Sequence, residues 1–143
     1  MPTIAVSSFG TLLKIGNGAT PTEAFTTIAE VLDIDGPGFE LGTEEVTAHD
    51  GSGWREFVPT LLQGGEITFD CNFNAAATQG FTGGVYDDMV DKTRRNFQLV
   101  LPTTSAKTAT FAAFVTAFPF TLPVEGVIRA NCTLQITGAV TWA

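Results

Sequence analysis

The chain has few charged residues, and most of them are acidic. Charged residues make up 15% of its 143 positions, against about 25% in an ordinary soluble domain. Seven Lys and Arg stand against fifteen Asp and Glu, so the formal net charge is −8. Static binding of nucleic acid requires basic side chains that displace counterions from phosphates, which argues against a nucleic-acid-binding protein. A low charge content also indicates that other copies of the chain cover part of the surface, because interface cores are depleted in charge.

Histidine and cysteine are almost absent, which removes most metal-site and catalytic chemistries. His49 is the single histidine, and Cys71 and Cys132 are the two cysteines. A structural zinc site takes four ligands, mostly Cys and His, and two cysteines do not make a disulfide framework. The sequence also lacks a GxSxG nucleophile elbow and a DxDxDG calcium loop. We therefore predict no catalytic residue, no metal, no cofactor and a protein that is not an enzyme.

Long hydrophobic runs are missing as well. No segment approaches the roughly twenty apolar residues of a membrane span, so we expect no membrane insertion. The first ten residues, MPTIAVSSFG, lack a basic region followed by an apolar core, and we expect no secretory signal. We expect one domain over residues 1–143, folded in a reducing cytosol.

Two segments alternate apolar and polar residues with a period of two, which is typical of strands with one buried face. They are residues 65–74 and 127–142. Both cysteines fall on the apolar faces, so we expect them to be core residues and not reactive thiols. The predicted apolar faces are Ile67, Phe69, Cys71 and Phe73 in the first segment, and Ile128, Ala130, Cys132, Leu134, Ile136, Val140 and Trp142 in the second.

Four further strands are expected. Residues 24–34 and 39–49 flank the turn sequence Asp-Gly-Pro-Gly, which favours a hairpin between them. Residues 96–102 form the third strand. The fourth, 108–120, has bulky residues on both faces, Phe111 and Val115 on one and Phe114 and Phe118 on the other. We therefore expect cover on both faces, with part of it supplied by a neighbouring subunit.

Residues 82–95 are predicted to form the single helix. Val85, Met89 and Val90 share one face, while acidic residues lie near the start and basic residues near the end, as the helix dipole favours. These charged residues are Asp87 and Asp88, then Lys92, Arg94 and Arg95. The predicted fold class is mainly β, a β-sandwich or barrel with one short flanking α-helix and a long inter-strand loop.

That loop, residues 49–65, is rich in residues that anchor protein interfaces. An exposed loop with so many apolar groups is unfavourable on a monomer, so we predict that it contacts another subunit. The alternative is that the loop folds back as a lid over its own core. The predicted interface residues are Trp54, Arg55, Phe57, Leu61 and Leu62.

The order of these features resembles that of the tail tube (major tail) proteins of long non-contractile-tailed bacteriophages. This family shares its fold with gene-transfer-agent tails and with the tube protein of type VI secretion. The similarity starts at GTLLKIG (10–16) and is most specific in EEVTAHDGSGWREFVPTLLQGGEITFD (44–70). It continues through FQLVLP (97–102) to the closing segment 124–142.

The resemblance implies a structural virion protein whose hexameric rings stack into a hollow tail tube, the conduit for DNA during ejection. It implies a tape-measure protein and tail-tip or terminator proteins as partners, no sequence-specific nucleic-acid binding, and assembly in the host cytoplasm into the virion tail. An acidic bore would let DNA slide, since DNA itself is densely negative. The acidic residues that we expect to face this bore are Glu66, Asp70 and Glu44.

The competing interpretation is a carbohydrate-binding β-sandwich module. Trp54 and Trp142 would then act as platforms on which sugar rings stack. This interpretation also accounts for an acidic protein without catalytic residues.

Overall fold

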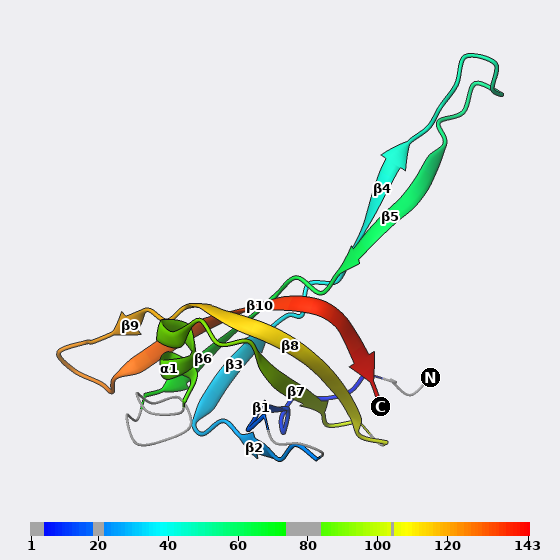
Figure 1. The fold of residues 1–143 in the computed structure, drawn as a ribbon. Coiled ribbons are helices and arrows are strands. Elements are labelled where there is room, and N and C mark those ends of the chain that lie inside the picture. The colour runs from blue at the N-terminus through cyan, green and yellow to red at the C-terminus, as the bar shows by residue number, and fades with distance from the viewer. Residues whose placement is uncertain (1–4, 19–21, 74–83, 104) are drawn as a thin grey trace.

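A computed structural model describes residues 5–18, 22–73, 84–103 and 105–143, which form a β-sheet body and a two-stranded arm (Figure 1). The mainly-β class with a single short helix is confirmed over these residues. In chain order the elements are β1 Leu12–Gly16, β2 Phe25–Thr27, β3 Val31–Asp35, β4 Glu40–Glu45, β5 Phe57–Gln63, β6 Glu66–Asn72, α1 Val85–Asp91, β7 Arg95–Leu101, β8 Lys107–Ala117, β9 Phe120–Thr121 and β10 Arg129–Trp142.

The body is one curved sheet of eight strands. Its order is β2-β1-β7-β8-β10-β6-β3, with β9 added beside β10, and all the pairs are antiparallel. The long β10 lies between β8 and β6 and bends with the sheet (Figure 1). Within the described residues β2 and β3 form the two edges of this sheet. The arm is a separate sheet of β4 and β5.

Most of the core comes from four long strands, β6, β7, β8 and β10, whose alternate residues turn to the same buried face of the sheet. The two clearest alternating segments form β6 and β10 as predicted, and both cysteines are buried. Phe97 of β7 and Phe111 of β8 stack with ring centroids 6.1 Å apart. The buried apolar residues of these strands are Ile67, Phe69, Cys71, Phe97, Leu99, Ala109, Phe111, Ala113, Val115, Ala130, Cys132, Leu134 and Ile136.

The predicted apolar faces extend less far than expected. Ile128 precedes β10 and Trp142 is its last residue, and both are exposed because the sheet no longer covers them there. Within one copy the strand at 108–120 is covered on one face only, since Phe114 is exposed on the outer face of β8. Cover of the outer face by a neighbouring subunit stays a prediction. Phe118 is buried because it follows the end of the strand and packs edge-on against Phe73, with ring centroids 5.9 Å apart.

Helix α1 is shorter than the predicted helix, and its first two predicted residues lie outside the described residues. It ends where Lys92 adopts a left-handed conformation and caps the carbonyls of Asp88 and Met89. The predicted basic residues therefore lie beyond its last turn, and Arg95 begins β7. Val85 is buried against the core as expected, but Val90 points to solvent.

The predicted hairpin around Asp-Gly-Pro-Gly does not form. The segment 24–34 contains two strands, because Glu30 takes a left-handed conformation between β2 and β3. β3 pairs with β6, with Asp35 opposite Thr68, while β4 pairs with β5. The turn sequence lies where the chain leaves the body for the arm, and burial of Ile34 against the core favours the long-range pairing.

The long loop predicted at 49–65 is also wrong in part, because residues 57–63 form β5. Glu45 of β4 lies opposite Phe57, and Leu41 opposite Leu62. All residues of both arm strands are exposed, so neither strand has the buried apolar face that gives a period of two. The connecting loop is limited to residues 46–56.

An ion pair between Asp88 and Arg95 links α1 to β7. The Asp88 carboxylate is buried and its Oδ1 accepts from Arg95 Nη2 at 2.7 Å, while Oδ2 has no hydrogen-bond partner among the described residues. Burial, only partly offset by the Arg95 guanidinium, raises the pKa of Asp88 from 3.8 to about 6, and the carboxylates of Asp87 and Asp91 add to the rise.

This raised pKa predicts a particular pH dependence of stability. The folded state holds the Asp88 proton more tightly than the unfolded state, so its stabilising contribution is complete below about pH 4 and is lost as the pH rises through 6. The free energy of unfolding should therefore fall less for Asp88→Asn than for the wild type between these pH values. Urea unfolding over this range measures both slopes.

The control is Asp50→Asn, which removes an exposed carboxylate from the arm loop. Its unfolding free energy should follow the wild-type pH dependence. Parallel curves for Asp88→Asn and the wild type would contradict the assignment.

Candidate functional site

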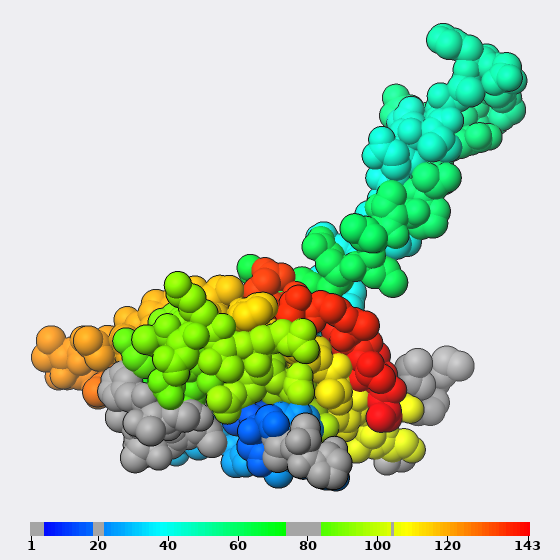
Figure 2. Space-filling model, in the orientation of Figure 1, coloured from blue at the N-terminus to red at the C-terminus, as the bar shows by residue number. Residues whose placement is uncertain are grey.

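The arm, residues 39–63, exposes large apolar side chains far from the body. Figure 2 shows it as a narrow projection with solvent on every visible side. Trp54 is 79% exposed, Leu61 83% and Leu62 80%, and Phe57 is also exposed. Exposure of apolar side chains to water is unfavourable in free energy. Several exposed apolar groups on one element therefore indicate a contact surface.

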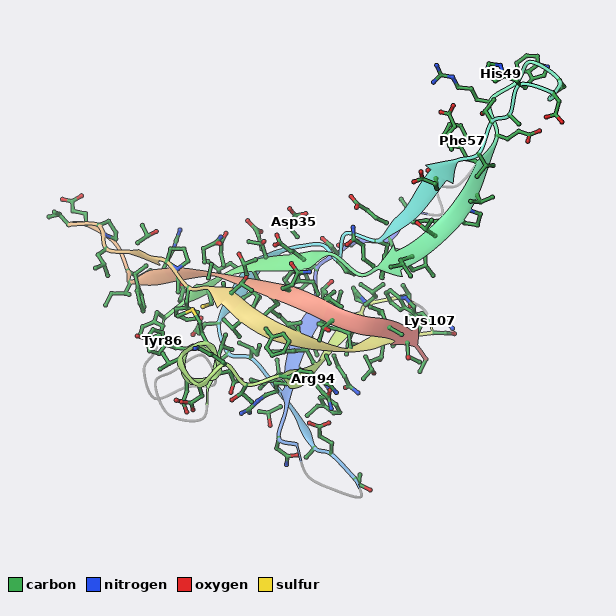
Figure 3. All side chains as sticks on the ribbon, turned by 45° about the horizontal axis from the view of Figure 1, so that its top comes forward. Asp35, His49, Phe57, Tyr86, Arg94 and Lys107 are labelled. Atoms are coloured by element: carbon green, nitrogen blue, oxygen red, sulfur yellow. The ribbon has the colours of Figure 1, made fainter. Side chains whose placement is uncertain are left out.

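The structure excludes the alternative that this segment is a lid over its own core. The arm leaves the body and its tip, near His49, lies well away from the sheet (Figures 1 and 3). Only its base touches the body, where Phe39 packs on Trp142 with ring centroids 6.4 Å apart. A groove of about 710 Å³ lies at this base, lined by Phe39, Glu40, Leu41, Leu62, Gln63, Gly64 and residues 136–140 of β10.

Backbone and side-chain hydrogen bonds keep the arm in register beyond its strands. Val46 N donates to the Glu56 carbonyl at 2.8 Å, and Glu56 N donates to Thr47 Oγ1 at 2.9 Å. At the base, Gln63 Nε2 donates to Glu40 Oε2 at 2.6 Å. The arm is thus an ordered hairpin although it buries almost no apolar surface.

His49 lies at the arm tip and is exposed (Figure 3). Among the described residues no group of three or more His, Cys, Asp and Glu lies close enough to hold a metal ion.

The predicted acidic residues fall in two places. Glu66 and Asp70 lie on the outer, polar face of β6, where Asn131 Nδ2 of the neighbouring β10 donates to Asp70 Oδ1. Gln135 lies opposite Glu66 and extends the same polar face. Glu44 lies on the arm strand β4 instead, so the structure does not bring it to this face.

The two tryptophans do not form a common platform. Trp54 lies in the arm loop, while Trp142 ends β10 and packs against Phe39 at the arm base. The length of the arm separates its loop from the end of β10 (Figure 1). A sugar chain would therefore not stack on both rings at one site.

Comparison with solved structures connects this architecture with tails and tubes. A chain in the tail of an empty gene transfer agent particle with C6 symmetry matches with a TM-score of 0.77 and 19% identity, over 97% of this chain and 99% of that one. A chain of the sheath–tube complex of an extracellular contractile injection system matches at 0.69 with 15% identity, over 98% and 92%. The SPP1 tail tube matches at 0.67 with 12% identity, over 92% and 75%.

The chain has the tail-tube fold. No protein-family model matches the sequence, and no curated protein matches it either. At these identities the likeness establishes the fold alone. No helix among the described residues is long and apolar enough to span a membrane.

The sequence patterns did not predict a second exposed apolar segment of this chain. The turn between β9 and β10, at the end of the body away from the arm (Figure 1), exposes Leu122 and Val127, and Val124 is fully exposed. The signal was present as the apolar residues of LPVEGVI (122–128). These apolar residues do not alternate regularly with polar ones, because a turn, unlike a strand or a helix, has no buried face and opposite exposed face.

Both cysteines of this chain should be unreactive toward thiol reagents in the native state. Cys71 and Cys132 lie on neighbouring strands of the core, and burial raises the pKa of the Cys132 thiol well above its ordinary value, with a further rise from Cys71. A thiol reagent such as dithionitrobenzoate should therefore react only after denaturation. Two rapidly titrating thiols in the native protein would contradict this burial.

Proposed function

We propose that this protein is the structural subunit of a tail tube, and that hexameric rings of it stack into a hollow tube through which DNA passes. The support is the combination of a tail-tube fold with an arm whose large apolar residues remain exposed in a single copy. A chain of the same fold belongs to a tail with C6 symmetry. No catalytic site is part of this proposal.

The arm is the proposed contact between subunits of adjacent rings. Trp54, Phe57 and Leu61 are large, exposed and apolar, and a long aromatic anchor loses little conformational entropy when it docks. Leu62 and Arg55 complete this surface, which keeps its register without any partner. Among the described residues, β2 and β3 form sheet edges without a further strand beside them, and lateral neighbours within a ring would cover these edges.

Replacement of Trp54 and Phe57 by serine should abolish tube formation without unfolding the body. Both side chains lie outside the core, so the free energy of unfolding should change by no more than about 0.5 kcal/mol per site. Negative-stain electron microscopy of concentrated wild-type protein should show rings or tubes, and the Trp54→Ser/Phe57→Ser variant should show none.

The matched control is Val90→Ser, which removes an exposed apolar side chain from α1 and should leave assembly intact. Normal tubes from the double variant would contradict the role of the arm. A wild-type protein that stays monomeric at high concentration and binds polysaccharide would contradict the tail-tube function itself.

The polar face of β6 is the proposed wall of the bore. Glu66 is exposed there and Asp70 is half-buried beside Asn131, so the face is polar and acidic. An acidic wall repels DNA weakly and offers no cation to replace phosphate counterions, so DNA would move without being held. Glu44 is not part of this wall, because it lies on the arm.

Positive charge introduced on this face should turn the bore into a DNA-binding surface. Tubes of Glu66→Lys/Thr68→Lys should retain double-stranded DNA at low salt and release it as salt increases, since each added lysine contributes a phosphate contact. Co-sedimentation of DNA with preformed tubes measures retention. Asp91→Lys, at the exposed end of α1, is the control for added positive charge, and equal retention by control and wall variants would contradict the assignment.

The remaining roles follow from a tube subunit. The proposed partners are identical copies, a tape-measure protein inside the growing tube, and tail-tip and terminator proteins at its ends. The proposed location is the virion tail, with assembly in the host cytoplasm.

A further inference from the structure

Charge is unequally divided between the arm and the body. The arm carries five acidic residues and one basic residue, Arg55. The other six Lys and Arg of the chain lie outside it. The acidic residues of the arm are Glu40, Glu44, Glu45, Asp50 and Glu56. An acidic arm should dock where its partner offers an uncompensated positive charge.

The arm cannot use the cations of its own body. It points away from the sheet, and its tip lies far from Arg94 and Lys107 (Figure 3). Its strands and loop extend about 3.3 Å per residue, so from Glu40 to Asp50 the arm spans on the order of 30 Å. A basic surface that receives its tip therefore lies on another molecule, and in a tube of identical subunits that molecule is a second copy.

Arg94 borders a hollow on the outer side of β7 and β8, which lie on the other side of β10 from the β6 face proposed as the bore wall. The hollow measures about 310 Å³ and crosses β7, β8 and β10. Its floor consists largely of small residues, which leave room for a large side chain, and its lining is Arg94, Asn96, Thr110, Phe111, Ala112, Thr137, Gly138 and Ala139. Gly138 has φ +80 and lies in the irregular part of β10, where the register with β8 shifts.

Arg94 is the positive charge available at this hollow. It is exposed and has no ion-pair partner among the described residues, unlike Arg95, which binds Asp88. Lys92 is also exposed nearby in the sequence, although Asp91 accompanies it. The larger groove at the arm base is a poorer receptor for an acidic tip, because the Glu40 carboxylate lies at its border.

We propose that the arm tip of one copy docks in the Arg94 hollow of a second copy, with Trp54 seated over the small residues and the Asp50 or Glu56 carboxylate beside the Arg94 guanidinium. This inference rests on the proposed tail-tube function and names the receptor surface for its arm. The contact is heterologous, because two different surfaces meet, so it propagates from copy to copy and suits a stack.

Charge reversal tests the pairing. Arg94→Glu should reduce the sedimentable, assembled fraction by about tenfold or more, because like charges then meet at the contact. Arg94→Glu combined with Asp50→Lys/Glu56→Lys should restore assembly. Lys107→Glu makes the same change in net charge at another exposed site and should assemble like the wild type.

Cross-linking tests the contact directly. The native cysteines are buried, so the double variant Ser52→Cys/Thr110→Cys adds one reactive thiol at the arm tip and one in the hollow. A short bismaleimide should join assembled copies into a ladder on a denaturing gel. Each single variant should give no ladder beyond dimers, and the pair Ser52→Cys/Lys107→Cys should give none.

Three outcomes are distinguishable. Restored assembly and a ladder support the docking. Tubes from Arg94→Glu that equal the wild type, or a ladder only with the Lys107→Cys control, overturn it while the tail-tube function stands. Absence of tubes from the wild-type protein overturns the proposed function on which the docking rests.

Discussion

The structure depends on an unequal burial of its strands. The long body strands β6, β7, β8 and β10 bury one face each against a common core, with Phe69, Phe97 and Leu134 almost inaccessible to water. The arm strands bury neither face, and an isolated two-stranded hairpin is at best marginally stable in water. The arm is continuous with β3 and β6, two strands of the core sheet. It is therefore held at its base by the body, while its length is available for contact with another molecule.

The same division explains the distribution of charge and of apolar groups. Among the described residues Asp88 is the one buried charged side chain, so the other acidic residues lie on the arm and on the exposed parts of the body. Apolar residues that the core does not take are concentrated on the arm and at the β9–β10 turn. On a soluble monomer both segments would be unfavourable. In a stack of rings, as proposed, they are the surfaces that identical neighbours cover.

Much of the body could be predicted from local pattern. In β6 and β10 the alternation of apolar and polar residues has a direct physical cause, because successive side chains of a strand point to opposite faces. That alternation indicated both strands and the burial of Cys71 and Cys132. It failed for β5, whose seven residues are all exposed, and for Val90, which occupies the helix face expected to be apolar. Local pattern reports burial, and these residues have none.

The sequence by itself determined the fold class, the absence of a recognisable catalytic or zinc motif, and the exposed aromatic residues that make Trp54 and Phe57 candidates for an interface. Only the tertiary structure decided that these residues stand on a projecting arm, that β3 pairs with β6, and that Glu44 is separated from Glu66. The reason is that strand pairing joins residues far apart in the chain. The choice between a local hairpin and a distant partner depends on which pairing buries more apolar surface, and in β3 the burial of Ile34 against the core favours the distant one.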